Sequence, residues 1–369
     1  KINVITVDWE SKPTAGISVT LVYNKHEWFS VEEQSEDGSY NWTSKSVDTP
    51  VYTETVKTGD DGQAVGAFTP KDGGIYRIIA TAEDEKGNPT RSSTFLWVSG
   101  RQFINWRQEN NDRIDLVADK KLYDVGDTAE VLIPSPYQGE VNALLTIERG
   151  GVLSYELMTL ESNSESVKIP IKPDYVPDVY VSVVLIKAPD KDNPLASFKI
   201  GYVELKVSTA DKELKISLTP DKEQYKPGET ATYQVEALDY EGQGVEAELS
   251  LSMIDKSVLA LADSSQPSLM DTFWSERGVG VQTASTLVIS VDRRNLEVAP
   301  EAKGGGGGFD DSSGTVRRQF PDTAYWNPVV LTDKDGKAEV QVKLPDNLTT
   351  WNMSAQAATA NTEVGSGEV

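Results

Sequence analysis

A repeat constrains the fold of this chain more than any other feature. Residues Asp119 to Ala129 match Asp221 to Ala231, 102 residues later, in the pattern D-K-x-x-Y-x-x-G-[DE]-T-A. A period of that length is a whole domain rather than one turn of a solenoid. In such a pattern the tyrosine would anchor a strand end in a core, the glycine would turn the chain, and the Asp/Glu-Thr pair would begin the next strand. We therefore expect two copies of one β-domain in tandem.

A second, shorter motif links the beginning of the chain to its end. Residues 58–64 match residues 332–338 in the pattern T-x-x-D-G-x-A. An Asp-Gly pair at this point is typical of a hairpin turn, in which glycine supplies a positive φ angle. We therefore expect the first and last domains to be related to each other and to the repeated pair.

Strand-like alternation accounts for most of the remaining chain. Clear examples are the segments Ile17–Tyr23, Val51–Val56, Gly74–Ala82, Val179–Ile186 and Ala247–Leu259. Short strands with turns at regular spacing, and no convincing helical period, favour antiparallel β-sandwiches. The sequence predicts an all-β chain of three tandem antiparallel sandwiches of the immunoglobulin/fibronectin-like kind. They are expected at residues 1–100, 111–208 and 212–369, and a long flexible insert at residues 260–318 interrupts the third.

The composition excludes several classes of function. The chain has 35 basic and 58 acidic residues, and its net charge of -23 repels phosphate, so nucleic acid is not an expected partner. It has no cysteine, which removes disulfides, thiolate nucleophiles and cysteine metal sites. No apolar run approaches 18 residues, so we expect no membrane span. Residues 1–7 read as a strand rather than a signal peptide, and we interpret the chain as a fragment of a longer protein.

The sequence offers no convincing catalytic or metal site. His26 is the single histidine, and with Glu27 it begins an H-E-x-x-H zinc motif, but Ser30 stands in place of the second histidine. No G-x-S-x-G accompanies it, so a serine hydrolase is also disfavoured. We expect a surface-loop histidine, no catalytic residue, no metal and no cofactor. Trp326 and Trp351 are expected to pack in the core of the third sandwich.

The insert at residues 260–318 differs from the strands on both sides of it. It contains scattered basic residues, a run of five glycines and a polar stretch at residues 310–314. Composition alone favours a surface loop or an interdomain linker. Phe273 with Trp274, and residues 286–291, are apolar for a free linker, so these residues are expected to dock on a neighbouring surface or to form a transient strand.

Four stretches in and around the third domain occur in a distinctive order. They are Y-K-P-G-E at residues 225–229, the strand pattern at 247–261, residues 316–326, and L-P-D-N-L-T-T-W at 344–351. In this order they resemble the bacterial branch of the alpha-2-macroglobulin family, which makes all three sandwiches macroglobulin-like. In that family one macroglobulin domain carries an inserted bait region. Proteases cut the bait, and the protein then collapses around the attacking protease.

The resemblance implies a role for the insert and for the rest of the protein. It places the bait at about residues 262–315. It further implies neighbouring macroglobulin and thioester-type domains in the full-length protein, and a periplasmic, extracellular or cell-surface location. The implied function is inhibition by entrapment, without enzymatic activity, of target endopeptidases of several specificities. The alternative is a structural or adhesive cell-surface protein of immunoglobulin-like modules, in which the insert is a flexible linker.

A bait must present cleavable residues in a segment that opens easily. A protease cleft binds roughly eight to ten residues in extended form, which a folded strand or helix supplies only by local unfolding. The candidate cleavage residues are Arg277, Arg293, Arg294, Lys303, Phe309, Arg317 and Arg318. Glycine gives the backbone its greatest freedom, so the loosest point is expected at Gly304, Gly305, Gly306, Gly307 and Gly308.

Overall fold

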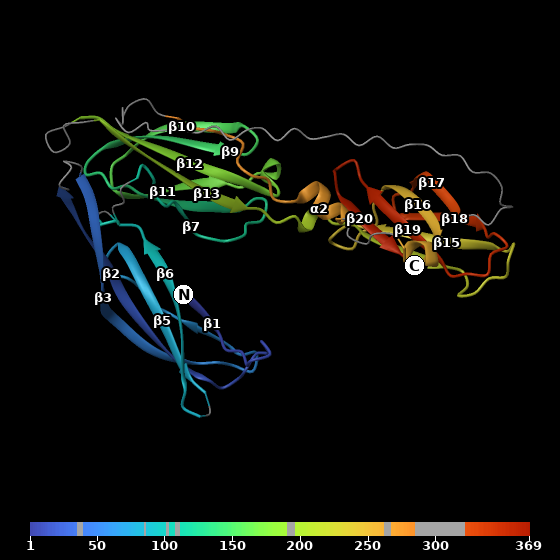
Figure 1. Ribbon diagram of the computed structural model, residues 1–369, viewed down its shortest axis with the longest axis horizontal. Coiled ribbons are helices and arrows are strands. Elements are labelled where there is room, and N and C mark those ends of the chain that lie inside the picture. The colour runs from blue at the N-terminus through green and yellow to red at the C-terminus, as the bar shows by residue number, and fades with distance from the viewer. Residues whose placement is uncertain are drawn as a thin grey trace. The chain divides into compact units, whose positions relative to one another are not determined.

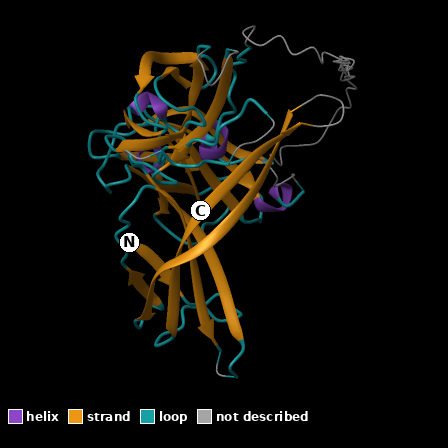
Figure 2. Ribbon diagram, turned by 90° about the vertical axis from the view of Figure 1, so that its left-hand side faces the viewer, coloured by secondary structure: helices purple, strands orange, loops and turns teal. Residues whose placement is uncertain are grey.

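Strands make up nearly all of the regular structure of this protein. The computed structural model describes residues 1–34, 40–84, 86–100, 103–107, 111–189, 196–261, 267–284 and 322–369. Within these ranges the paired strands run antiparallel, and the helices are short (Figure 2). The predicted all-β, antiparallel class is confirmed.

The first sandwich packs a four-stranded sheet against a two-stranded sheet (Figure 1). The larger sheet has the order β3-β2-β5-β6, and the smaller one pairs β1 with β4. Leu21 and Tyr23 of the larger sheet are fully buried, and Ile2 and Val4 of the smaller sheet pack on the same cluster. The strand bounds are β1 (Ile2–Ile5), β2 (Ser18–Gln34), β3 (Tyr40–Lys57), β4 (Gln63–Gly66), β5 (Gly74–Glu83) and β6 (Pro89–Val98).

The strands β2 and β3 are longer than the alternation at Ile17–Tyr23 and Val51–Val56 predicts. They contain 17 and 18 residues and pair along their length. Beyond the buried cluster, polar pairs continue the ladder, as where Ser30 Oγ lies 2.8 Å from Ser44 Oγ. Backbone hydrogen bonding extends the strands past the point where one face is buried, so the apolar period ends before the strand does.

The second sandwich pairs a four-stranded sheet with a three-stranded sheet. Their orders are β10-β9-β12-β13 and β11-β8-β7. Alternate residues, such as Ile147 of β9 and Val181 of β12, are buried on the inner face. The strand bounds are β7 (Val117–Ala118), β8 (Thr128–Pro134), β9 (Val141–Glu148), β10 (Val152–Leu160), β11 (Ser164–Pro170), β12 (Asp178–Lys187) and β13 (Ser197–Lys206).

The third sandwich is formed by strands from both sides of the insert. Its sheets have the orders β17-β16-β19-β20 and β14-β15-β18. Leu249, Leu251 and Met253 of β16 and Met353 of β19 are fully buried in its core. The bounds are β14 (Lys215–Pro220), β15 (Thr230–Leu238), β16 (Glu248–Asp255), α1 (Lys256–Leu259), α2 (Leu269–Trp274), β17 (Thr323–Leu331), β18 (Lys337–Lys343), β19 (Trp351–Ala358) and β20 (Val364–Glu368).

The repeated D-K-x-x-Y motif builds the same hydrogen-bonded turn in the second and third sandwiches. In the second, Tyr123 OH donates to Asp119 Oδ1 (2.8 Å) and accepts from Lys120 N (3.0 Å). In the third, Tyr225 OH makes the equivalent bonds at 2.6 and 3.1 Å. The tyrosine hydroxyl therefore closes a local turn as well as anchoring the ring.

The glycine of the same motif turns the chain into the next strand. Its φ angle is +95° at Gly126 and +77° at Gly228, and β8 and β15 begin two residues later. Burial raises the pKa of Tyr123 and of Tyr225 to about 12. The hydrogen bond from Tyr225 holds the pKa of Asp221 below its usual value. The roles predicted for the tyrosine, the glycine and the Asp/Glu-Thr pair are confirmed.

The T-x-x-D-G-x-A motif also has one structure in its two copies. Thr58 is buried and accepts a hydrogen bond from Ile17 N (3.0 Å), and the glycine of the Asp-Gly pair in this copy has a φ angle of +71°. Thr332 is buried and accepts a hydrogen bond from Ala247 N (2.7 Å), and the glycine of its Asp-Gly pair has a φ angle of +75°. In each copy the threonine thus pins the hairpin turn to the residue before the central strand, β2 or β16. The two copies of the motif therefore form the same turn, and the relation between the first and last domains stays a prediction.

Two expectations for the third sandwich are wrong. The strand expected over Ala247–Leu259 ends at Asp255, because the Asp255 side chain accepts a hydrogen bond from Ser257 N (2.8 Å) and caps the helical turn α1. Trp326 lies on the edge strand β17 with 67% of its surface exposed, so it is not a core residue. Trp351 does pack against the core, as expected.

The described residues form two compact units. One contains the first and second sandwiches together with residues 277–284, and the other contains the third sandwich with α1 and α2. The boundaries expected at residues 100, 111, 208 and 212 stay predictions. In the parts of the chain listed above as described, no helix has the length and apolar character needed to cross a bilayer.

We predict that Tyr123→Phe lowers the free energy of unfolding by about 1–2 kcal/mol, because it leaves Lys120 N and Asp119 without their buried hydroxyl partner. The loss of stability is measured by urea unfolding, and amide hydrogen exchange in β8 shows where in the sandwich it acts. Tyr155→Phe in the same sandwich is the control, since Tyr155 is 73% exposed, and its effect should stay within about 0.5 kcal/mol. Equal effects of the two changes would contradict the proposed role of the turn.

Candidate functional site

The insert leaves and re-enters the third sandwich at one place. β16, which precedes it, and β17, which follows it, are antiparallel neighbours in one sheet, with Glu248 opposite Leu331 and Ile254 opposite Thr323. At the base of the insert Asp255 N donates to Asp322 O (3.0 Å). β16 and β17 are therefore the two arms of a hairpin, and everything from Lys256 to the start of β17 is its connection.

The first part of the insert docks on the third sandwich. Helix α2 is capped by Ser268, whose hydroxyl accepts from Asp271 N (3.0 Å). Trp274 Nε1 donates to Thr362 O (3.2 Å), and Lys212 Nζ lies 5.4 Å from the centroid of the indole ring. The docking expected for this apolar stretch is confirmed at Trp274. The second apolar stretch, residues 286–291, lies outside the described residues.

The structure describes one of the candidate cleavage residues, and the remaining candidates lie outside the described residues. Arg277 is described, and its side chain is exposed. The others lie outside the described residues, as do the five glycines; they are Arg293, Arg294, Lys303, Phe309, Arg317, Arg318 and Gly304–Gly308.

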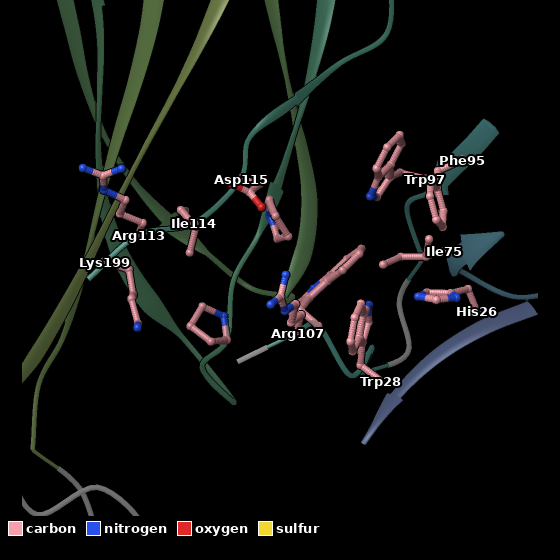
Figure 3. A pocket seen from close by; sticks show the side chains of 13 residues that line it. His26, Trp28, Ile75, Phe95, Trp97, Arg107, Arg113, Ile114, Asp115 and Lys199 are labelled. Atoms are coloured by element: carbon pink, nitrogen blue, oxygen red, sulfur yellow. The ribbon is translucent and has the colours of Figure 1, made fainter. Parts of the chain in front are cut away.

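A cavity of about 240 Å³ lies in the unit formed by the first two sandwiches (Figure 3). Its aromatic wall comes from the first sandwich and the segment after it, and its polar wall from the second; the lining includes His26, Trp28, Phe95, Trp97, Trp106, Arg107, Arg113, Asp115 and Lys199. The guanidinium carbon of Arg107 lies 5.3 Å from the Trp28 ring centroid. Three cations and one carboxylate among aromatic rings suit an anionic group carried on an apolar body.

Asn163 ties the segment that carries Trp106 to the second sandwich. Its side chain accepts from Ile104 N (3.0 Å) and donates to Ile104 O (2.7 Å), and its carbonyl accepts from Trp106 Nε1 (2.6 Å). Asn163 is buried. These contacts fix residues 104–106 on the second sandwich.

His26 is not the surface-loop residue that was expected. It lies in β2 with 9% of its surface exposed, and its ring packs edge-on against Trp28 and Phe95. Its Nδ1 lies 2.5 Å from Asp48 Oδ1, and Arg77 donates to the other carboxylate oxygen (3.1 Å). Burial alone would raise the pKa of Asp48, but the hydrogen bonds from His26 and Arg77 outweigh it and hold that pKa below 3.8.

The described residues offer no cation site. No three histidine, aspartate or glutamate side chains gather among them in a way that could hold a metal ion. His26 has one acidic neighbour, Asp48, and two aromatic neighbours, which suits a structural hydrogen-bonded pair.

Three family models match successive parts of the chain. Residues 1–100 match bacterial macroglobulin domain 6, residues 114–261 match the alpha-2-macroglobulin bait region domain, and residues 323–369 match the alpha-2-macroglobulin family model. The last two matches end and begin on the two sides of the insert. The chain belongs to the alpha-2-macroglobulin family.

Curated bacterial relatives agree with these matches. The alpha-2-macroglobulin homolog of Nostoc sp. is 28% identical over 375 residues, which cover 100% of this chain and 20% of that protein. The alpha-2-macroglobulin of Ralstonia nicotianae is 29% identical over 300 residues, which cover 77% of this chain and 18% of that protein. The chain therefore spans about a fifth of the length of these relatives.

A solved structure also aligns with the chain. The native conformation of the Escherichia coli alpha-2-macroglobulin aligns at 18% identity with a TM-score of 0.41, covering 100% of this chain and 23% of that one. The family assignment rests on the family models and the curated relatives.

Several residues that define the site could not be found from the sequence. Asp255 and Asp322 are 67 positions apart, and their hydrogen bond closes the base of the insert. The partner of Trp274 is a backbone carbonyl at Thr362. Backbone donors and acceptors carry no side-chain signal, so periodicity and motif spacing do not reveal these contacts.

We predict that Asp48 stabilises the first sandwich in a pH-dependent way. Its folded-state pKa lies below the ordinary value of 3.8, so the carboxylate contributes stability above that pH, and the contribution is lost as pH falls through the folded pKa. The difference in melting temperature between the native protein and Asp48→Asn should be largest near neutral pH and shrink below about pH 4. A difference that does not change between pH 7 and pH 3 would contradict this.

Proposed function

We propose that this chain carries the trigger of a broad-spectrum protease inhibitor. Target endopeptidases of several specificities cut the insert between residues 260 and 318. The cut then permits a change of conformation in the full-length protein, which entraps the protease. The chain itself catalyses no reaction, takes no cofactor and acts outside the cytoplasm, in the periplasm or at the cell surface.

The closed base of the insert is the observation that carries this proposal. Asp255 N and Asp322 O are hydrogen-bonded, and β16 and β17 continue the ladder beyond them. β16 also pairs with β19 on its other side. A cut in the connection therefore breaks a covalent link between two strands that stay paired. The sandwich survives as a folded unit, while the tether that the uncut insert imposes is lost.

The placement of the insert relative to the family matches supports the same function. The bait region domain match ends at Leu261, and the next family match begins at Thr323. The residues between them contain all of the candidate cleavage residues, both basic and aromatic. A segment that different proteases must reach needs such variety, because each class of protease selects a different side chain before the scissile bond.

Limited proteolysis tests the proposal. Trypsin, chymotrypsin and elastase are each added at low ratio, and the first cut is located by mass spectrometry. For each protease the first cut should fall between residues 260 and 318. First cuts near residues 100 or 209, with the insert resistant, would support the adhesive-module alternative.

A variant with a built-in control sharpens the test. Replacing Arg277, Arg293, Arg294, Lys303, Arg317 and Arg318 by glutamine removes every trypsin site from residues 260–318. Trypsin should then lose its early cut in the insert, by about a hundredfold or more in rate, because it needs a cation before the scissile bond. Chymotrypsin should cut the variant as fast as the native chain.

The full-length protein allows the entrapment step to be tested. After cleavage its scattering profile should change, and the bound protease should lose activity on protein substrates while keeping activity on small peptide substrates. A cut that leaves both the profile and the substrate range unchanged would contradict entrapment.

A further inference from the structure

Residues Arg277–Ala284, which we call the strap, lie against the second sandwich (orange trace in Figure 1). Three hydrogen bonds fix the strap at regular intervals. Arg277 N donates to Asp178 Oδ1 (2.9 Å), Gly280 N donates to Arg149 O (2.6 Å), and Tyr202 OH donates to Thr283 Oγ1 (3.3 Å). These partners belong to β12, to the β9–β10 turn and to β13, so the strap crosses the outer face of one sheet.

Burial of polar residues on that outer face agrees with a covering segment. Thr146, Glu148, Asp178 and Ser182 alternate with core residues along β9 and β12, so they point away from the core. Such residues are normally exposed on a sandwich. Here their exposed fractions are 8%, 2%, 0% and 1%. Ser182 lies opposite Thr146 on one side and, on the other side, opposite Tyr202, which is one of the residues that hold the strap.

A side chain would crowd the neighbouring backbone at one position of the strap and not at another. A Cβ added at Gly280 would lie 3.1 Å from Gly150 Cα and O and 3.2 Å from Arg149 O, whereas a Cβ at Gly278 would meet no atom within 4 Å. The turn that receives Gly280 is itself fixed. The Arg149 guanidinium donates to Val176 O (3.0 Å), among other carbonyls.

The strap begins at Arg277, a candidate cleavage residue whose side chain is exposed. A protease that cuts after Arg277 must hold several residues on each side of the bond in extended form. On the N-terminal side, Trp274 ends α2 and is hydrogen-bonded to Thr362. On the C-terminal side, Gly280 is held against the Arg149–Gly150 backbone. An exposed side chain at Arg277 is therefore combined with a backbone that is held at its own N–H and on its C-terminal side.

We propose that the strap sets the N-terminal limit of the cleavable bait and protects the Arg277–Gly278 bond in the native protein. Trypsin-like proteases are directed to sites beyond Ala284, and Asp178, Gly280 and Tyr202 are the positions that determine this selection. The role of the strap as a limit of the bait rests on the proposed function. The protection of the Arg277–Gly278 bond is a property of this chain that can be measured independently.

The test compares Gly280→Val with Gly278→Val in the whole chain. The rate of trypsin cleavage after Arg277 is measured for each protein and divided by the rate for a synthetic peptide of the same sequence spanning residues 270–290. This division removes any effect of valine on how well trypsin recognises and cuts the local sequence. When opening is fast, cleavage of a folded site follows the population of its open form. The native chain should be cut after Arg277 at least about a hundredfold more slowly than its peptide.

The two valine variants should differ in their normalised rates of cleavage after Arg277. Gly280→Val should raise the normalised rate about tenfold or more, because it forces the strap off Arg149, and Gly278→Val should stay within about twofold of the native value. Tyr202→Phe removes the third hydrogen bond and should give a smaller increase. Amide exchange of residues 277–284 should change in the same order.

Three results would overturn the inference. They are cleavage of native Arg277 at the rate of its peptide, equal rates for the two valine variants, and unchanged protection in Gly280→Val. Failure of the bait proposal looks different. In that case no early cut falls between residues 285 and 318, while the protection of Arg277 and its loss in Gly280→Val are still observed.

Discussion

The pairing of β16 with β17 is the constraint on which the third sandwich depends. Leu249, Leu251 and Met253 of β16 are fully buried, and each such side chain contributes roughly 1.5–3 kcal/mol by burial. The entropy cost of closing a loop rises only by about 0.6 kcal/mol for each doubling of its length. The ladder can therefore hold its register across a very long connection. A long insert in this position therefore costs the sandwich little stability.

The first part of that connection is structured because it finds two surfaces. Helix α2 uses an indole ring against the third sandwich, and the strap uses backbone amides against the second. The two contacts differ in kind. The indole ring uses its N–H donor and its π face, whereas a backbone amide can bond to a fixed carbonyl or carboxylate at any sequence position. The strap consequently needs only a glycine where the two backbones approach most closely.

Local chemistry explains which predictions succeeded. The turn at Asp119–Tyr123 and its copy at Asp221–Tyr225 involve side chains within a few residues of each other, so the pattern of residue types already specifies the hydrogen bonds. The same holds for the Asp-Gly turns after Thr58 and Thr332. The predictions for His26 and Trp326 failed because burial depends on which strand lies next to the residue. Trp326 is on an edge strand, and His26 faces a neighbouring strand that supplies Asp48.

The sequence by itself determined the all-β class, the repeated turns and the position of the insert. These follow from residue alternation, from glycine at positive φ, and from the break in strand pattern after β16, all of which are short-range properties. Only the tertiary structure decided that β16 and β17 close the base of the insert, and that Arg277 lies in a segment held on another sandwich. Both depend on backbone amides that donate to groups far away in the chain, and a backbone amide is the same in every residue except proline.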